Sequence, residues 1–385
     1  MPSTRPKVAL ILTGGGARAA YQVGVLRGLA EIIPDGASNP FAIICGTSAG
    51  AINAAALAAD AADFRRAVRR LMVVWKHFQV RQVYRADPWG AFYNSARWIL
   101  GVATGGAFSR RPVSLLDNSP LVELLRRYLD FSAIERSIDA GHLAALSVTC
   151  SGYSSGQSVT FFQGKPGLQS WQRARRIGVP MTITLEHLLA SSALPFIFPP
   201  VHIHREYFGD GSMRQIAPVS PALHLGADRL LVIGTGREPP PSQERVKSET
   251  FPSLAQIAGH ALNSIFLDSL EVDLERMQRI NRTIALVPPE VLEKNRYPLH
   301  HVDFRMLAPS EELERIALAN AHELPRTIRI LLQSVGAVRR SGANLLSYLL
   351  FEKSYCRALI RLGYEDTMRR EEDLAAFLGW QDSGL

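Results

Sequence analysis

Short apolar runs alternate with longer amphipathic stretches over the first sixty residues. Residues 8–13 and 41–45 are apolar and partly β-branched, which predicts two short buried parallel strands. Residues 17–33 carry apolar side chains at helical spacing, and residues 49–62 are rich in alanine, so both predict helices. This β-α-β-α order indicates the start of an α/β sheet, and such sheets place their sites at the carboxyl ends of the strands.

The alternation continues to about residue 235. The further predicted elements are a helix over 120–129, strands over 143–149 and 158–162, a helix over 185–193, one strand over 202–208 and a buried strand over 230–234. We therefore predict an α/β domain over residues 8–235, with a mainly parallel central sheet.

Two segments interrupt the pattern. Residues 63–112 are less regular and rich in aromatic side chains, which favours a helical cap packing its own small core over a pocket wall or a membrane contact. Residues 236–252 include three consecutive prolines and few apolar side chains, which is typical of a linker. The remainder, residues 253–385, is predicted to be mainly helical, with one strand near 302–307 that returns to the sheet.

Composition limits the class of protein. The 385 residues are 47% hydrophobic and 20% charged, as in globular proteins, and no apolar run has the length of a transmembrane helix. Cys45, Cys150 and Cys356 are far apart and show no metal-ligand spacing, so we expect reduced thiols, no metal and a cytoplasmic location.

The net charge is positive, at +8, with 43 Lys and Arg against 35 Asp and Glu. Such a balance suits an anionic surface, either phospholipid or nucleic acid. The arginine pairs are scattered, however, and no nucleic-acid motif accompanies them, so solvated helix faces are the favoured explanation. We expect no nucleic-acid partner, and membrane contact at most at the periphery of the protein.

A glycine loop, Gly14-Gly15-Gly16, joins the first predicted strand to the first helix. With Ala19 it matches a relaxed dinucleotide-binding fingerprint, but the second strand does not end in the acidic residue that holds a ribose. The same loop suits another anion, because backbone N–H groups at a helix N-terminus can hold the oxyanion of an acyl-transfer intermediate. Arg18 either adds charge there or is structural, and the sequence leaves both open.

The second strand leads into Gly46-Thr47-Ser48-Ala49-Gly50, a G-x-S-x-G between a strand and a helix. A nucleophilic serine needs a tight strand-to-helix turn that exposes Oγ, and small neighbours permit it. The pentapeptide alone is only suggestive, but its context strengthens it. Parallel neighbouring strands would also bring this turn beside the glycine loop.

A nucleophilic serine requires a base, and the sequence offers two kinds. The ten histidines have no distinctive catalytic context, although His202 and His204 are in phase on one predicted strand. Asp210, in Gly209-Asp210-Gly211 at a strand end, is the alternative, provided that the site excludes water. An aspartate before glycine is also common in ordinary turns.

Three blocks of sequence together resemble the patatin-like phospholipase family. They are residues 14–26 with the glycine loop, residues 46–50 with the serine, and residues 190–201 followed closely by 209–211. Their order and spacing fit the family over roughly residues 8–235, and the C-terminal third resembles the tail of bacterial members more weakly. Ala19 and Ser212 depart from the family's usual residues, but neither replaces a reacting group.

The resemblance implies a three-layer α/β/α fold and a Ser-Asp dyad that needs no histidine, cofactor or metal. By position, Ser48 would be the nucleophile and Asp210 the base, with Gly14, Gly15, Gly16 and Arg18 at the oxyanion site. Gly46, Gly50 and Gly211 would support these turns. The implied activity is hydrolysis of acyl esters of phospholipids or other acyl lipids. An acyltransferase with the same dyad, and a peripheral lipid-binding protein with an unused site, remain alternatives.

Overall fold

The computed structural model of the chain describes residues 6–85, 114–237, 251–288, 290–291 and 300–380. The expected linker core and most of the aromatic-rich segment lie outside these residues. The strands are β1 (Val8–Leu12), β2 (Ile43–Thr47), β3 (Ala145–Gly152), β4 (Ser158–Gly164), β5 (Trp171–Arg173), β6 (Arg176–Pro180), β7 (Val201–Ile203), β8 (Glu206–Asp210), β9 (Arg229–Ile233) and β10 (Asp303–Leu307).

Helices make up most of the remaining described chain. The α-helices are α1 (Ala20–Ile32), α2 (Ala49–Ala59), α3 (Phe64–Lys76), α5 (Ser119–Tyr128), α6 (Ser132–Asp139), α7 (Leu185–Ser191), α8 (Ser220–His224), α9 (Leu254–Asn263), α10 (Ser269–Ile284), α12 (Leu313–Asn320), α13 (Arg326–Ser334), α14 (Ala343–Leu349), α15 (Lys353–Met368) and α16 (Glu371–Leu378). Shorter turns are η1 (Gly16–Ala19), η2 (Val80–Gln82), η3 (Gly211–Arg214), η4 (Ser264–Asp268, a π-helix), η5 (Ala321–Glu323) and η6 (Arg340–Gly342).

The described strands form one mixed sheet in the order β10-β9-β1-β2-β3-β4-β6-β5, with β8 added beside β3 and β7 beside β8. The five strands from β10 to β3 are parallel. Leu12 of β1 lies opposite Gly46 of β2, so the loops that follow these two strands leave the same edge of the sheet side by side. The predicted meeting of the glycine loop and the serine turn is therefore confirmed.

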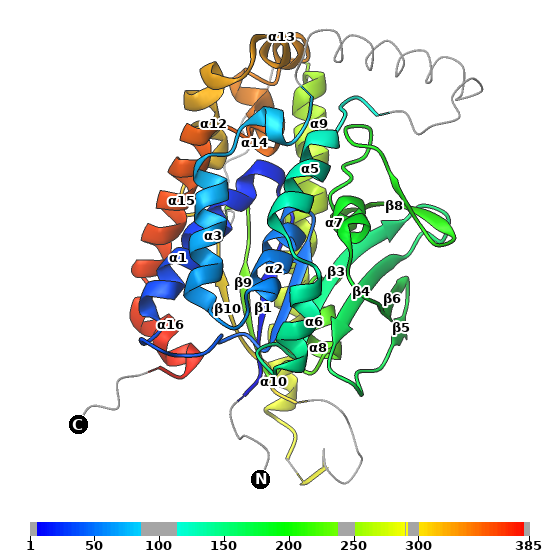
Figure 1. Cartoon of the computed structure of the whole chain (residues 1–385), viewed down its shortest axis with the longest axis vertical. Helices are drawn as coiled ribbons and strands as arrows, with labels where there is room; N and C mark the ends of the chain where they lie inside the picture. Colours follow the sequence, from blue (N-terminus) through cyan, green and yellow to red (C-terminus); the bar gives the residue numbers. More distant parts are fainter. Residues whose placement is uncertain (1–5, 86–113, 238–250, 289, 292–299, 381–385) are drawn as a thin grey trace.

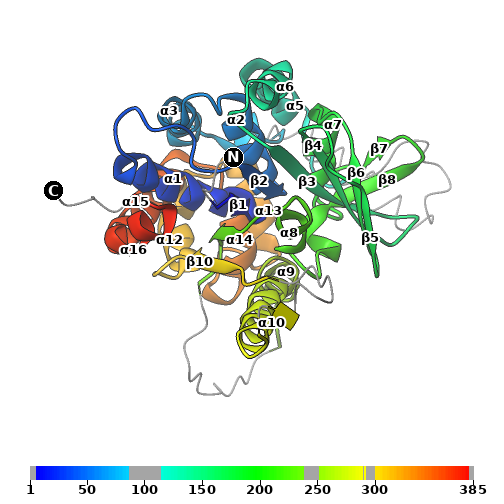
Figure 2. The same ribbon diagram turned by 90° about the horizontal axis from the view of Figure 1, so that it is seen from below.

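Helices cover both faces of this sheet, as the predicted three-layer α/β/α fold requires (Figures 1 and 2). Leu10 and Leu12 pack into the larger apolar core, which includes side chains of α1, α2, α3 and α15. Ala9 and Ile11 point the other way, into a smaller core with side chains of α8 and α10. A strand buried on both faces needs apolar side chains at every position, which explains the unbroken run in β1.

The C-terminal region is mainly helical, as predicted, and it is built into the same core. β10 extends the sheet beside β9, and α15 packs along α1. The hydroxyl of Tyr21 in α1 donates a hydrogen bond of 3.0 Å to the carboxylate of Asp366 in α15. Helices from beyond residue 300 thus cover the helix that follows the glycine loop.

Two predictions about local structure are wrong. Residues 202–208 are not one strand but the hairpin of β7 and β8, with His204 at a positive φ of 52° in the turn, so His202 and His204 do not share a strand face. The first part of the aromatic-rich segment is the regular helix α3. Its Trp75 packs with Phe78 and, across the chain, with Phe351, so these rings belong to the main core and not to a separate one.

Candidate active site

Ser48 lies in a strained turn between β2 and α2. Its φ is +55°, a left-handed value that residues with a side chain seldom adopt and that tends to occur at functional sites. The Ser191 hydroxyl accepts a 2.9 Å hydrogen bond from the Ser48 backbone N–H and donates one of 2.6 Å to the carbonyl of Thr149. The turn is thereby tied to both α7 and β3.

Glycine is required on both sides of this turn because the backbone segments approach closely. A Cβ at Gly50 would lie 2.3 Å from the carbonyl oxygen of Leu12, and one at Gly46 would lie 2.5 Å from the Cα of Ala51. Both distances are far below van der Waals contact. The G-x-S-x-G pattern therefore has a packing reason in this chain, because glycine at both positions allows the close approach of the backbone around Ser48.

Asp210 ends β8, the strand that pairs antiparallel with the carboxyl end of β3. Its side chain is fully buried, and its Oδ1 accepts a 2.9 Å hydrogen bond from the N–H of Ser212. Burial raises the pKa of the carboxyl group to about 6, an effect that hydrogen bonds from Ser48 and Ser212 partly offset. The pKa of this carboxyl thus lies close to neutral pH, the range in which a carboxylate can act as a general base.

The second carboxylate oxygen of Asp210 has no hydrogen-bond partner of normal geometry among the described residues. The Ser48 hydroxyl is nevertheless close enough to lower the pKa of this carboxyl group. We interpret the pair as facing each other with a loose hydrogen bond, as is common in active sites without substrate. The structure thus brings together the two side chains predicted to react, which are 162 positions apart in the sequence.

The glycine loop lies beside Ser48, and Gly16 and Ser48 both line the same groove. Among the described residues, the backbone N–H groups of Gly14, Gly15 and Gly16 take no part in a hydrogen bond. Gly16 has a positive φ of 54°, and a Cβ there would lie 2.3 Å from the carbonyl oxygen of Tyr348. The loop therefore offers unpaired donors next to the serine and needs glycine to do so.

Arg18 does not take the predicted place at the oxyanion site, because its side chain turns toward the C-terminal helices. It is 1% exposed and donates hydrogen bonds to Ser347 (2.8 Å), Glu314 (2.7 Å) and Asn344 (3.0 Å). The guanidinium also lies 4.0 Å from the centre of the Tyr348 ring. Its partners all come from residues 314–348, so the structural alternative holds for this side chain: it ties the glycine loop to the C-terminal region.

Several residues that shape the site carry no signal in the sequence. Ser191 lies within the block 190–201 but had no assigned role. Thr235 donates to the carbonyl of Gly14, and Phe266 lies where a Cβ of Gly14 would be, at 2.5 Å. These residues and Tyr348 are each more than 140 positions away in the sequence from the turn that they contact. Only the tertiary fold brings them to the serine turn or the glycine loop.

The other candidates for catalysis are not at this site. No hydrogen bond links any of the ten histidines, all of them in the described part of the chain, to Ser48 or Asp210. Burial raises the pKa of the nearby Cys45 thiol to about 12, so this thiol stays protonated at neutral pH. The described residues contain no group of His, Cys, Asp and Glu side chains that could hold a metal ion.

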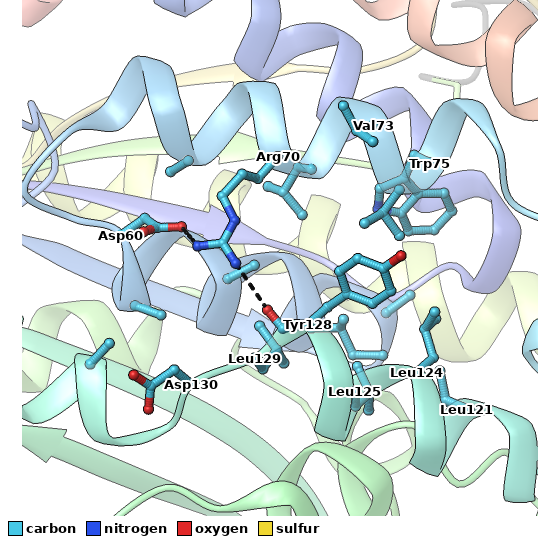
Figure 3. Close-up of a pocket in the computed structure, with 18 of the residues that line it drawn as sticks. Asp60, Arg70, Val73, Trp75, Leu121, Leu124, Leu125, Tyr128, Leu129 and Asp130 are labelled. Atoms are coloured by element: carbon cyan, nitrogen blue, oxygen red, sulfur yellow. Dashed lines mark hydrogen bonds and ion pairs between the residues drawn. The ribbon is translucent and has the colours of Figure 1, made fainter.

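A groove of about 710 Å³ extends from Ser48 along α2. Its floor is α2, and its walls are α3 on one side and α5 on the other, as Figure 3 shows from the side chains of Trp75, Leu121, Leu124 and Leu125. The lining is mostly aliphatic and aromatic near the serine and charged at the far end, where Asp60 and Arg70 are joined by Asp130 and by Arg136 of α6. Its volume and lining are typical of sites for apolar small molecules.

The chain matches one family model, described as patatin-like phospholipase, over residues 10–223, which is more than half of its length. A comparison with curated proteins gives no match.

Solved structures that the chain matches include VipD from Legionella pneumophila, at 14% identity and a TM-score of 0.32, covering 96% of this chain and 67% of that one. Another is human GIVD cytosolic phospholipase A2 in complex with methyl gamma-linolenyl fluorophosphonate, at 15% identity and a TM-score of 0.41, covering 97% of this chain and 59% of that one. The chain thus spans about three fifths to two thirds of the length of these proteins.

Proposed function

Because the chain belongs to the patatin-like phospholipase family, we propose that it hydrolyses acyl esters of phospholipids or related lipids through a Ser48–Asp210 dyad. The main support is one observation: a serine at a strained strand-to-helix turn faces a fully buried carboxylate of raised pKa, at the end of an apolar groove. A carboxylate in water is too weak a base for a serine, and burial makes this one stronger.

In the first half of the proposed reaction, Asp210 removes the proton from the Ser48 hydroxyl as Oγ attacks the ester carbonyl. The backbone N–H groups of Gly14, Gly15 and Gly16 stabilise the oxyanion that forms. The ester C–O bond then breaks, and Asp210 gives its proton to the departing alcohol. The acyl group remains on Ser48 as an ester.

In the second half, a water molecule gives a proton to Asp210 and attacks the acyl-enzyme. The glycine loop again stabilises the oxyanion, and collapse of this intermediate releases the fatty acid. The proton on Asp210 returns to Ser48 Oγ, so the enzyme is regenerated. The same residue acts as base and acid in both halves, which a pKa near the working pH allows.

The test is labelling with a fluorophosphonate probe together with turnover of a p-nitrophenyl ester. We expect the wild type to be labelled on Ser48 and to turn over, and Ser48→Ala and Asp210→Asn to lose both while remaining folded. Ser334→Ala, an exposed serine far along the chain on α13, is the matched control and should behave as the wild type. A folded Ser48→Ala protein with wild-type esterase activity would refute the dyad.

The same experiment separates the alternatives. An acyltransferase would also be labelled, but it would form a new acyl ester when a lysolipid or another alcohol is added, at the expense of free fatty acid. A lipid-binding protein with an unused site would show neither labelling nor turnover in a well-folded wild type.

We also propose a cytoplasmic protein that contacts anionic membranes peripherally. No helix in the described part of the chain is long and apolar enough to cross a membrane. Phe196 supports peripheral contact, because its side chain is 74% exposed, its φ is +65°, and Leu194 and Phe198 beside it line the groove. Sedimentation with vesicles rich in phosphatidylglycerol should exceed that with phosphatidylcholine vesicles, and Phe196→Ala should reduce it. Equal, negligible binding to both would contradict the proposal.

A further inference from the structure

The face of α2 that forms the floor of the groove carries three alanines and one isoleucine at regular spacing. Ala49, Ile52, Ala56 and Ala59 are three or four positions apart, so they form one stripe along the helix. Ile52, Ala56 and Ala59 are partly exposed, whereas the alanines on the opposite side of α2 are buried in the core. The stripe thus leaves room for a ligand above it.

This stripe starts next to the nucleophile. Ser48 is the residue before α2, and the eleven residues of the helix extend for about 16 Å away from it. A linear group attached to the Ser48 hydroxyl can therefore lie along the helix axis.

The walls of the groove are apolar for most of this length. Leu71 and Val74 of α3 face Leu121 and Leu125 of α5 across the floor, and all four line the groove. Val73 on α3 and Tyr128 on α5 are 61% and 44% exposed, so the groove is open to solvent along its upper edge. A flexible apolar ligand would cover these side chains.

The far end of the groove changes abruptly to charged groups. Arg70 of α3 donates hydrogen bonds to the carboxylate of Asp60, at 2.6 Å, and to the backbone carbonyl of Tyr128, at 3.4 Å (Figure 3). Arg66 donates a second hydrogen bond to Asp60, at 3.4 Å. Arg70 thereby links the end of α2 to the end of α5 across the groove.

We propose that the groove along α2 binds one unbranched acyl chain of the substrate, and that Ala56, Ala59 and the Arg70 bridge set the longest chain it accepts. This inference rests on the proposed ester hydrolysis, because it assumes that the carboxyl end of the chain lies at Ser48. Methylene groups lying over the alanine stripe lose contact with water, whereas any beyond Ala59 would displace water from Asp60 and Arg70.

The expected effect of chain length follows from burial. Each methylene group that enters the groove should tighten binding about fourfold, the factor that corresponds to roughly 0.8 kcal/mol per buried methylene. The gain should stop at the length that reaches Arg70. A leucine at position 59 should move this limit to shorter chains. A leucine at position 56, nearly one turn of about 5.4 Å closer to Ser48, should move it further.

The experiment measures Kd by calorimetry for saturated fatty acids from butyrate to stearate, and in parallel kcat/KM for the corresponding p-nitrophenyl esters. The proteins are the wild type, Ala59→Leu, Ala56→Leu and Arg70→Ala. Ala319→Leu, on an exposed face of α12 outside the groove, is the control for the added side-chain volume and should keep the wild-type profile. Arg70→Ala should extend the gain to longer chains.

The inference is supported if the longest chain that still gains affinity becomes shorter in Ala59→Leu, shorter again in Ala56→Leu, and longer in Arg70→Ala. It is overturned if the three variants keep the wild-type limit, or if they weaken every chain length by the same factor. Because fatty-acid binding needs no turnover, a protein that shows the shifting limit in Kd but hydrolyses no ester would refute the proposed function and leave the groove assignment standing.

Discussion

Replacement of Asp210 by asparagine should abolish turnover and yet leave the protein at least as stable as the wild type at neutral and alkaline pH. The carboxylate is fully buried, and one of its oxygens has no hydrogen-bond partner of normal geometry among the described residues. Burial disfavours its ionised form and raises its pKa from 3.8 to about 6. The folded protein thus carries an ionised group that would be better solvated in the unfolded chain.

The size of this effect on the free energy of unfolding follows from the pKa shift of Asp210. A change of about 2 pKa units corresponds to about 3 kcal/mol between the two protonation states. Since the pKa is higher in the folded state, the folded protein holds the proton more tightly. Stability is therefore highest where both states are protonated, falls as pH rises from 3.8 to about 6, and is reduced by the full amount above that.

Asparagine keeps the shape of the side chain and removes its charge. Its carbonyl can still accept the hydrogen bond from the Ser212 N–H, and its amide can donate toward Ser48. An amide N–H left without a partner costs about 1–3 kcal/mol, which offsets part of the gain. We therefore expect a gain between zero and about 2 kcal/mol at alkaline pH.

The measurement is urea unfolding of the wild type and of Asp210→Asn at roughly pH 4 and roughly pH 8, where this carboxyl is protonated and ionised in the folded state. The free-energy difference between the two proteins isolates this group, because other carboxyl groups titrate in both. It should shift in favour of the variant by about 2 kcal/mol between the two pH values, because the carboxyl of the unfolded chain is already more than half ionised at roughly pH 4. A difference independent of pH would refute the reasoning that Asp210 is a buried, destabilised base.

Three further predictions concern the same site. In the wild type, kcat/KM should rise with pH through an apparent pKa of about 6, because Asp210 must lose its proton to act as base; a flat pH–rate profile would show that another group limits the reaction. Arg18→Met should destabilise the protein by about 3–5 kcal/mol in urea unfolding, because it leaves the partly buried Glu314 without its partner. The double change with Glu314→Gln should recover part of the loss, and no recovery would contradict the pairing. Gly50→Ala should cost about 3 kcal/mol or more and abolish fluorophosphonate labelling, because the added Cβ would overlap the carbonyl of Leu12; unchanged labelling would refute the packing argument.

The pattern of apolar and polar residues was sufficient to predict the bounds of a helix or strand where one segment forms one element with a clear periodicity. β1, α1 and α2 lie within one or two residues of the predicted bounds except at the first turn of α1, which is 3₁₀, and at the end of α2. The same pattern gave a wrong prediction at residues 202–208, because apolar and polar side chains alternate in the same way in one strand and in the two arms of a tight hairpin. What separates them is the positive φ at His204, which no side chain in that segment signals.

The aromatic-rich segment shows a second kind of limit. Its composition favoured a helical cap packing its own small core, but the described part forms a helix that packs in the main core. Whether Trp75 packs within its own segment or against Phe351 depends on contacts between residues that lie 276 positions apart. Periodicity describes which face of a helix is apolar, but it does not say what covers that face.

The sequence by itself determined three things: the two side chains proposed to react, the glycines of both turns, and the parallel strands whose ends bring those turns together. These depend on residue types and on short-range spacing, which the chain carries directly. The tertiary structure alone decided the pKa values at the site, the contacts that hold its loops in place, and the groove. The pKa of Asp210 depends on burial, and the orientation of Arg18 depends on Ser347, Glu314 and Asn344. The groove depends on helices from separate parts of the chain. Burial and long-range contact are properties of packed segments, and no single segment encodes them.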